Sequence, residues 1–414
     1  MKKLVLLCLM LNAVGLGAQD LDRQIQSVTT SIDALKQQQS ELDQQLEALK
    51  LQRIQRDLKA VGLPSAPYIE HQALFLAYDE AHEQARWVAH IITPDIIEGT
   101  VFRSNDFRPD PLVPTGTAVE EDYFLKFLQP DSTYEYDGYG YDRGHLAPSA
   151  DFRWSQTALS ESYFYSNMSP QRPEFNREAW ADLESFLRGY VYRFPESQLY
   201  VVTGPILTDD LPKVERSPNG VSIPEYYFKV ALDLQNRRGI GFVLPHQKVT
   251  YPLETFAMPI DEVERRTGLD FFPALPAGQQ AALEGSFEAS VWFPELKAGD
   301  VEPLYPPNLP PNHFNTIQAR RYMGNGEEIE VCGTVVSTRR SRSGNLWMNV
   351  DKQFPNQVFS VFIKKKDLIN FSYQPEKELL HQQVCFKGTV QNFNGTPTMN
   401  VVQEQEVRMH ALKK

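Results

Sequence analysis

The chain has 414 residues, which is too long for one ordinary hydrophobic core and predicts two or three folded units. Hydrophobic residues make up 42% of the chain and charged residues 23%, as in globular proteins that bury a sizeable core. The formal net charge of −12 argues against a protein that coats nucleic acid with its whole surface, but it leaves room for a local basic groove.

The first residues predict export. Two lysines precede an apolar run from Leu4 to Gly15, and small residues follow up to Ala18. This pattern predicts a secretory signal peptide over residues 1–18, and hence a periplasmic or secreted protein; the alternative is a buried helix. The run is short for a membrane span and no later stretch approaches the required length, so we expect no span in the mature chain.

Residues 20–60 are predicted to form one long helix, because they contain neither Gly nor Pro and their apolar residues recur at steps of four and three. The recurring apolar positions are Leu21, Ile25, Val28, Ile32, Leu35, Leu42, Leu46 and Leu49. This heptad pattern predicts a coiled coil, and therefore a homo-oligomer of unspecified number. The alternative is a lone amphipathic helix docked on the next domain.

Residues 66–300 mix strand-like runs with one clear helix over 175–192, which predicts an α+β domain. The expected strands are 85–92, 199–203, 226–232 and 239–244. Residues 301–315 are rich in proline and are interpreted as a stiff linker.

Residues 316–414 contain short β-rich runs that predict a five-stranded, OB-like barrel. The runs are 329–337, 346–350, 358–363, 384–390 and 398–402. From Pro310 to Lys414 there are 14 lysines and arginines against 9 aspartates and glutamates, a net charge of +5 on an acidic protein.

The basic residues of this last segment could bind nucleic acid, with Trp347, Phe359 and Phe362 as stacking platforms. The candidate basic residues are Arg339, Arg340, Arg342, Lys364, Lys365 and Lys366. The alternative is that the charges are solvated loop residues and the aromatic side chains belong to the core.

The densest group of reactive side chains is Asp142-Arg143-Gly144-His145, with a carboxylate, a guanidinium and an imidazole within four positions. Histidine titrates near neutral pH and is the usual general base that activates water. Arginine presents a bidentate fork to phosphate, and the glycine lets the backbone turn tightly. A four-residue pattern occurs by chance in unrelated proteins. This motif therefore becomes specific only in combination with residues further along the chain.

Asn176 and Glu184 lie on the predicted helix. On an α-helix their spacing corresponds to a rotation of about 80° and a rise of about 12 Å, so they share a broad face. One amide oxygen and one carboxylate suit Mg²⁺, a hard ion that keeps most of its hydration waters. Taken alone, Asn176 would be interpreted as a helix N-terminal cap.

From about Arg86 to Leu275 the chain closely resembles the DNA/RNA non-specific endonuclease family, which includes endonuclease G-like enzymes. The matching blocks are Trp87–Thr93, Arg103–Asp110, Asp142–His145, Ser166–Gln171, Asn176–Glu184, Val202–Pro205, Ile223–Val230, Gly241–Gln247 and Asp261–Leu269. Their number and order make the resemblance specific. It implies a ββα-metal fold and an Mg²⁺-dependent endonuclease that cuts DNA and RNA, with Mn²⁺ as a possible substitute.

The resemblance also implies roles for individual residues. His145 would be the general base, Asn176 the direct metal ligand, and Glu184 would hold metal-bound water. Arg143 and Arg103 would neutralise phosphate charge in the transition state. The supporting residues that fix the loop and the surroundings of the metal would be Asp142 and Asn167.

Two other functions fit parts of the sequence. A non-catalytic nucleic-acid-binding scaffold would be expected to have lost His145, Asn176 or Arg143, and all three are present. A phosphodiesterase for small nucleotides would need a closed pocket, which a sequence does not reveal.

Four further residues allow a structural interpretation. His90 is interpreted as structural because it lies in an apolar run. His246 is interpreted as a loop residue; the alternative is that it lines a cleft. Cys332 and Cys385 either form a disulfide, as an exported protein permits, or are two separately buried small side chains.

Overall fold

The computed structural model describes residues 2–306, 308–310 and 312–409, with side chains from Asp20 onward. Its internal contacts divide the chain into two units, residues 1–53 and residues 54–414. In the part of the chain that the structure describes, we find no helix with the length and apolar character of a membrane span.

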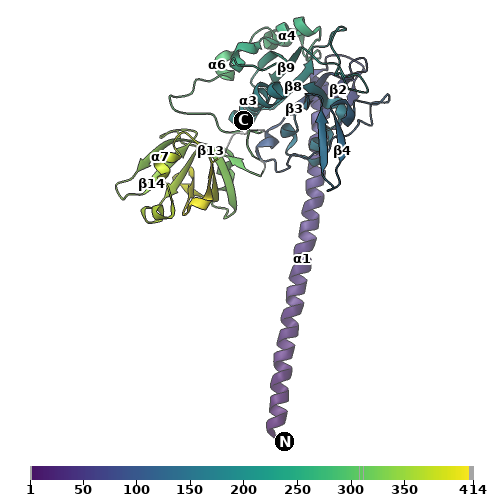
Figure 1. Ribbon diagram of the computed structural model, residues 1–414. Coiled ribbons are helices and arrows are strands. Elements are labelled where there is room, and N and C mark those ends of the chain that lie inside the picture. Colours follow the sequence, from purple (N-terminus) through teal and green to yellow (C-terminus); the bar gives the residue numbers. More distant parts are fainter. Residues whose placement is uncertain (1, 307, 311, 410–414) are drawn as a thin grey trace. The chain divides into compact units, whose positions relative to one another are not determined.

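The N-terminal helix α1 (Lys2–Val61) runs without interruption for 60 residues (Figure 1). It confirms the predicted helix over residues 20–60 and extends it to Lys2; the predicted signal peptide falls where side chains lie outside the description. The heptad positions stay exposed, each between 46% and 64%: Leu21, Ile25, Val28, Ile32, Leu35, Leu42, Leu46 and Leu49. The coiled coil therefore stays a prediction.

The central sheet has seven strands, all joined antiparallel, in the order β1-β2-β3-β8-β9-β10-β11. Their bounds are Ile69–Glu70 (β1), Leu74–Asp79 (β2), Gln84–Ile92 (β3), Leu199–Pro205 (β8), Tyr226–Asp233 (β9), Arg238–Pro245 (β10) and Ala257–Met258 (β11). The four predicted strands are confirmed as β3, β8, β9 and β10. Together with the helices they confirm a mixed α+β domain.

Both faces of this sheet are covered. Alternate residues of a strand point to opposite sides, so one strand contributes to the packing on both faces. On β9, Phe228 and Val230 join a core that also contains the end of α1 and the helices α4 (Ile260–Thr267) and α5 (Ala277–Glu284). Tyr227, the residue before Phe228, packs on the other side against the start of the predicted site helix, with its ring centroid 5.6 Å from that of Trp180.

The site helix differs from its prediction at the start. Phe175–Trp180 (η5) is a π-helix that runs directly into α3 (Ala181–Arg193). The rotation of about 80° assumed regular α geometry, which the wider π turns do not have. Single π turns are frequent at functional sites.

Shorter elements connect these parts. They are the pairs β4 (Phe124–Leu128) with β5 (Tyr134–Gly138) and β6 (Asp142–His145) with β7 (Met168–Gln171), and the helices α2 (Gln156–Glu161) and α6 (Ala289–Trp292). Among the 3₁₀ turns are Glu120–Asp122 (η2), Ser149–Phe152 (η3) and Tyr165–Asn167 (η4).

The proline-rich stretch that we expected to be a stiff linker is packed. The carbonyl of Pro306 accepts hydrogen bonds from Ser185 and Arg188 of α3. Leu304 and Leu309 are buried in a small cluster with Cys332 and Cys385. Apolar side chains between the prolines account for this difference.

The C-terminal strands have a core of their own and close into a ring (Figure 1, yellow-green). Their order is β12-β13-β14-β15-β17-β16-β18, and an additional pairing joins β13 to β16. The bounds are Phe314–Asn315 (β12), Glu328–Arg340 (β13), Leu346–Val350 (β14), Phe359–Ile363 (β15), Gln383–Phe393 (β16), Thr396–Asn400 (β17) and Val407–Met409 (β18). The five strands of the ring match the five predicted runs.

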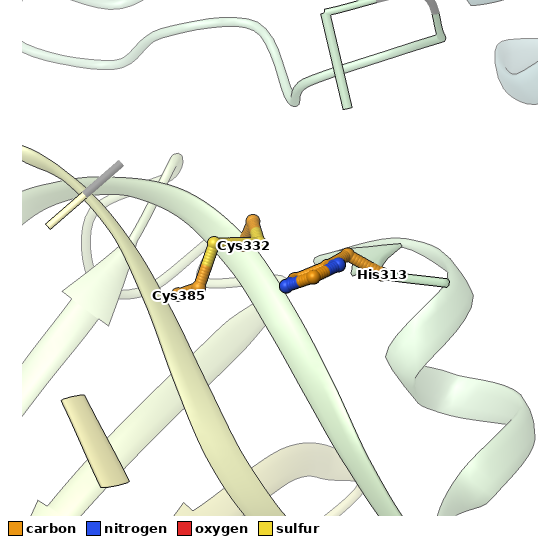
Figure 2. A group of neighbouring side chains, drawn as sticks. All are labelled: His313, Cys332 and Cys385. Carbon is orange, nitrogen blue, oxygen red and sulfur yellow. A yellow bond between two sulfur atoms is a disulfide. The ribbon is translucent and has the colours of Figure 1, made fainter. Parts of the chain in front are cut away.

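Cys332 of β13 and Cys385 of β16 are direct cross-strand neighbours and form a disulfide (Figure 2). Of the two alternatives left open by the sequence, the structure has the bonded pair. The pairing of β13 with β16 brings their Cα atoms to 4.0 Å, although 53 residues separate them in the chain.

Candidate active site

The candidate site is built on two paired strands and the helix after them in the chain. β6 carries the Asp142–His145 motif and pairs antiparallel with β7, placing Asp142 opposite Gln171 and His145 opposite Met168. The chain then enters η5 and α3, which carry Asn176 and Glu184. The order strand, strand, helix is the predicted ββα arrangement of the motif residues.

Gly144 is required by close packing. A Cβ atom built on it would lie 2.2 Å from the side chain of Gln171, which is fully buried. A larger residue here would therefore force the buried Gln171 side chain to move.

His145 lies in an aromatic setting. Its ring is 5.0 Å from Tyr163 and 5.6 Å from Phe107, and its Nε2 is buried without a hydrogen-bond partner. Burial, with the charges of Arg103 and Arg143, lowers the pKa of His145 to about 3. The imidazole is therefore neutral at physiological pH, as a base must be before it accepts a proton.

Arg143 lies beside His145 and is well supported. Its guanidinium stacks over Phe107 at 3.7 Å and over Phe124 at 5.0 Å, and approaches Glu120 at 3.7 Å. Arg143 also hydrogen-bonds to Tyr165. Stacking on ring faces holds a planar guanidinium in place without using up further hydrogen-bond donors.

Arg103 and Arg108 differ in what they face. Arg103 is exposed, yet lies close enough to His145 to lower its pKa. Arg108 instead donates to Asp106 and Ser160 and stacks on Phe164. Of these two arginines, Arg103 is the one whose charge lowers the pKa of His145.

Asp142 orients the amide of Asn176. The Asn176 Nδ2 donates to Asp142 Oδ2 at 2.9 Å, and Arg177 holds the same carboxylate with two bonds of 2.8 and 2.7 Å. Because Nδ2 is engaged, the carbonyl oxygen Oδ1 is the atom left for a ligand. The helix N-cap is Glu174, so the cap interpretation of Asn176 is wrong.

Glu184 lies one helical turn before Arg188 and is almost buried. Its Oε2 is 3.6 Å from Arg188 Nη2, and its side chain is 10% exposed. Burial raises the pKa of Glu184 to about 7, while Arg188 and Lys229 pull it down. A cation bound nearby would stabilise the ionised form of this buried carboxyl group and lower its pKa.

Behind Glu184 lies a buried polar network that the sequence analysis missed. Asp151 Oδ1 binds Arg188 Nη1 at 2.5 Å, and Asp151 Oδ2 binds His90 Nε2 at 2.9 Å. Lys229 is also buried, and its Nζ donates to Thr203 and to the carbonyl of Leu146. Burial opposes the charge of Asp151, yet Arg188 and His90 lower the pKa of this carboxyl.

Two other histidines that the sequence analysis singled out, His90 and His246, are buried in this domain. His90 is structural as predicted, being fully buried against Asp151. His246 lies in the bend after β10, as predicted, and is buried there: it accepts a hydrogen bond from the Arg172 amide and contacts the Pro224 carbonyl. It thereby holds the end of β7 next to β9.

Asn167 fixes the chain just after His145. Its Oδ1 accepts from the Ala147 amide at 2.9 Å, and its Nδ2 donates to the carbonyls of Ala147 and Ser162. All of these groups are buried. These contacts hold the backbone of Ala147; the supporting role of Asn167 in the site stays a prediction.

The residues fit a divalent cation that keeps most of its water. Asn176 offers one amide oxygen, and Glu184 offers a carboxylate. Because burial raises the pKa of Glu184, a nearby cation would stabilise its ionised form. In the described residues, the groups of three His, Cys, Asp or Glu with converging ligand atoms lie elsewhere. One is His313 with Cys332 and Cys385, whose sulfur atoms are bonded to each other (Figure 2); the other is Asp261, Glu264 and Glu284.

The predicted basic residues of the C-terminal segment do not join this site. Arg339, Arg340 and Arg342 lie on β13 and the turn after it, and Lys364, Lys365 and Lys366 follow β15. They belong to the C-terminal ring of strands, which has a separate core.

Comparison with known families matches residues 55–278 to the DNA/RNA non-specific endonuclease family. The match spans more than half of the chain and contains β6, β7 and the site helix. The chain belongs to this family. The nuclease fold therefore carries the Asp142–His145 motif in the setting that its resemblance implied.

The nuclease is similar to several curated relatives. It is 32% identical over 240 residues to mitochondrial endonuclease G of Bos taurus, covering 53% of this chain and 74% of the relative. It is 33% identical to the mitochondrial nuclease EXOG of Danio rerio (54% and 64%), and 32% identical to nuclease C1 of Cunninghamella echinulata (50% and 83%). A solved structure described as the EndoG/EndoGI complex is 28% identical, with a TM-score of 0.45, covering 55% of this chain and 94% of that one.

Proposed function

We propose that this nuclease is an exported, metal-dependent endonuclease that hydrolyses phosphodiester bonds of DNA and RNA. The observation that carries the proposal is the convergence at the β6–β7 pair. A neutral imidazole lies there between two arginines, and the motif carboxylate orients an amide whose oxygen is left for a ligand.

His145 is the general base. Its ring is neutral at working pH, and because Nε2 is buried, Nδ1 is the nitrogen that accepts the proton of the attacking water. A pKa of about 3 alone would make a weak base. The incoming phosphate brings negative charge beside Arg103 and Arg143, which cancels part of their effect and raises the basicity of His145.

Arg143 and Arg103 bind the phosphate and stabilise the extra negative charge of the pentacoordinate transition state. Arg143 is preorganised by its stacking on Phe107, and Arg103 approaches from the exposed side. Asn176 Oδ1 and Glu184 would hold Mg²⁺, Asn176 directly and Glu184 through water. When bound, the ion supplies charge for the leaving oxygen and lowers the barrier to bond cleavage.

The test uses residues 19–414 with supercoiled plasmid and total RNA, each in Mg²⁺ and in EDTA. The His145→Asn variant should lose cleavage by on the order of 10²–10⁴-fold while still binding substrate. Exposed His381 offers the matched control, since His381→Asn makes the same change at a left-handed position that asparagine tolerates. Binding without cleavage by the unaltered chain would establish the scaffold instead.

Export is supported by the basic and apolar start of the chain and by the buried Cys332–Cys385 disulfide, since such bonds persist in oxidising compartments. Expression of the whole chain should release a periplasmic or secreted product that begins near Gln19. A cytosolic product of full mass would contradict export.

The second copy of this chain is the partner proposed for α1. Its eight heptad side chains form one exposed apolar stripe, and a coiled coil covers such a stripe in register. Light scattering should show an oligomer that Leu35→Gln with Leu42→Gln dissociates. The matched change Ser40→Gln lies off the stripe and should leave the mass unchanged; a monomeric parent would overturn the proposal.

A further inference from the structure

The C-terminal ring has an outer face that carries aromatic side chains. On β14, Leu346, Met348 and Val350 are buried, whereas Trp347 between them is only partly covered. Trp347 is the cross-strand neighbour of Phe362 on β15, which is also partly exposed inside an otherwise buried strand. Alternation therefore turns both rings outward, away from the core.

A third ring completes this group. Phe393, at the end of β16, is 51% exposed and its centroid is 5.0 Å from that of Trp347, which is 4.6 Å from Phe362. We call Trp347, Phe362 and Phe393 the stacking face. Phe359, another predicted platform, is fully buried and belongs to the core, so that part of the prediction is wrong.

A hollow of about 610 Å³ adjoins the stacking face and is lined by Asn345, Phe362, Lys364, Lys365 and Lys366. The hollow is an open surface depression, and local contacts shape one side of it. Asn345 Oδ1 accepts the backbone amide of Lys365 at 2.9 Å, and the aliphatic stem of Lys365 lies directly over Gly344. A Cβ on Gly344 would come within 2.8 Å of that stem.

The basic side chains around the stacking face differ in whether they are free to bind a phosphate. Lys364, Lys365 and Lys366 are exposed, and no ion pair involving them is found among the described residues. Arg339 is the cross-strand neighbour of Trp347 and lies on the same face. Arg340 turns to the opposite side and is paired with Glu376 by two hydrogen bonds, which removes it from the predicted set.

We propose that the stacking face and the lysine-lined hollow bind single-stranded nucleic acid, with bases on Trp347, Phe362 and Phe393 and phosphates on Lys364–Lys366. Flat rings accept any base, and the lysines follow the backbone, so binding is tolerant of sequence. Paired bases expose no free face, so a single strand fits and a duplex does not. Binding is independent of catalysis; its use in recruiting substrate rests on the proposed endonuclease function.

The experiment measures the affinity of the His145→Asn chain for a fluorescent oligothymidylate in EDTA, across a series of salt concentrations. Trp347→Ala should weaken binding by at least about fivefold, and Trp347→Phe should retain most of it. Replacing Lys364, Lys365 and Lys366 by Gln should lower the salt slope by about two, since each single-strand phosphate contact contributes about 0.7.

The controls separate specific binding from general attraction. Lys377, Lys387 and Arg408 are exposed on the same domain and do not line the hollow, so their replacement by Gln removes equal charge. Equal losses in the two triple variants, or unchanged affinity in Trp347→Ala, would overturn the proposal. If Trp347→Ala lowers thermal stability, Phe393→Ala at the exposed strand end replaces it as the test. Cleavage by the unaltered chain is scored separately, so failure of the nuclease function is seen by itself.

Discussion

The β6–β7 site and the C-terminal stacking face both combine aromatic rings with cations. They differ in how firmly these groups are held and in how exposed they are. At the site, Arg143 is only 17% exposed and is clamped over Phe107, and Asn176 is oriented by Asp142. On the stacking face, Phe393 and the three lysines stay exposed. Chemistry needs groups held in one geometry before the substrate arrives, whereas capture of a variable polymer needs accessible groups that can adjust.

The largest effect is expected from a variant that removes a positioning contact in the site but keeps every reacting group. It tests whether cleavage depends on the fixed geometry of the site. Asp142→Asn takes away the carboxylate that orients Asn176 and binds Arg177, so the Mg²⁺ concentration for half-maximal cleavage should rise about 10- to 100-fold. A Mg²⁺ titration of plasmid cleavage measures this. Arg177→Gln leaves the Asn176 contact in place and should change the requirement much less; equal effects would refute the positioning role of Asp142.

The pH dependence of cleavage offers the next test. The pKa of His145 is about 3, so in the free enzyme this base is already deprotonated at neutral pH. Glu184, with a pKa of about 7, takes up a proton as the pH falls through neutrality, and the rate should then decline about tenfold per pH unit. More Mg²⁺ should shift this decline to lower pH, because a cation favours the carboxylate.

Glu184→Gln checks the assignment of that decline. It should lower the rate at pH 8 and abolish the decline near pH 7, since the amide does not titrate. Profiles of kcat/KM at low and high Mg²⁺ provide the measurement. A decline that persists in the variant would belong to a group other than Glu184.

A smaller effect is expected from the stacking face. Trp347→Ala should raise KM for long single-stranded substrates about fivefold and leave kcat unchanged, because the reacting groups lie on a separate core. A short oligonucleotide that reaches only the site should be cleaved at the parental kcat/KM. A fall in kcat with both substrates would show that the two regions are not functionally separate.

The smallest effect concerns Glu284, a buried carboxylate outside the site. Burial, with Glu264 and Asp261, raises the pKa of Glu284 to about 8. The folded state therefore holds this proton more tightly than the unfolded chain does, and its contribution to stability declines as the pH rises from about 4.5 to 8. Glu284→Gln should raise the melting temperature more at pH 8 than at pH 5, with cleavage unchanged.

Much of the fold could be predicted from local pattern. The absence of Gly and Pro with regular apolar spacing predicted the helix of residues 20–60, and apolar runs predicted β3, β8, β9 and β10. The π turn at Phe175–Trp180 could not be predicted, since it depends on packing of Phe175 and Trp180 against Tyr227. The proline-rich stretch was misjudged because composition does not show that Leu304 and Leu309 find a buried place.

The amino-acid sequence by itself determined the family and the motif residues, because the side-chain types that phosphodiester chemistry needs occur in a specific order. Only the tertiary structure decided which groups support them. Asp151, Arg188 and Lys229 come from three distant segments and meet behind Glu184. The pairing of β13 with β16 placed Cys332 beside Cys385, so that the disulfide could form. The packing of β15 decided that Phe359 is buried and Phe362 is partly exposed. Contacts between distant segments and the side of a strand that faces the core are set by packing, which local sequence does not encode.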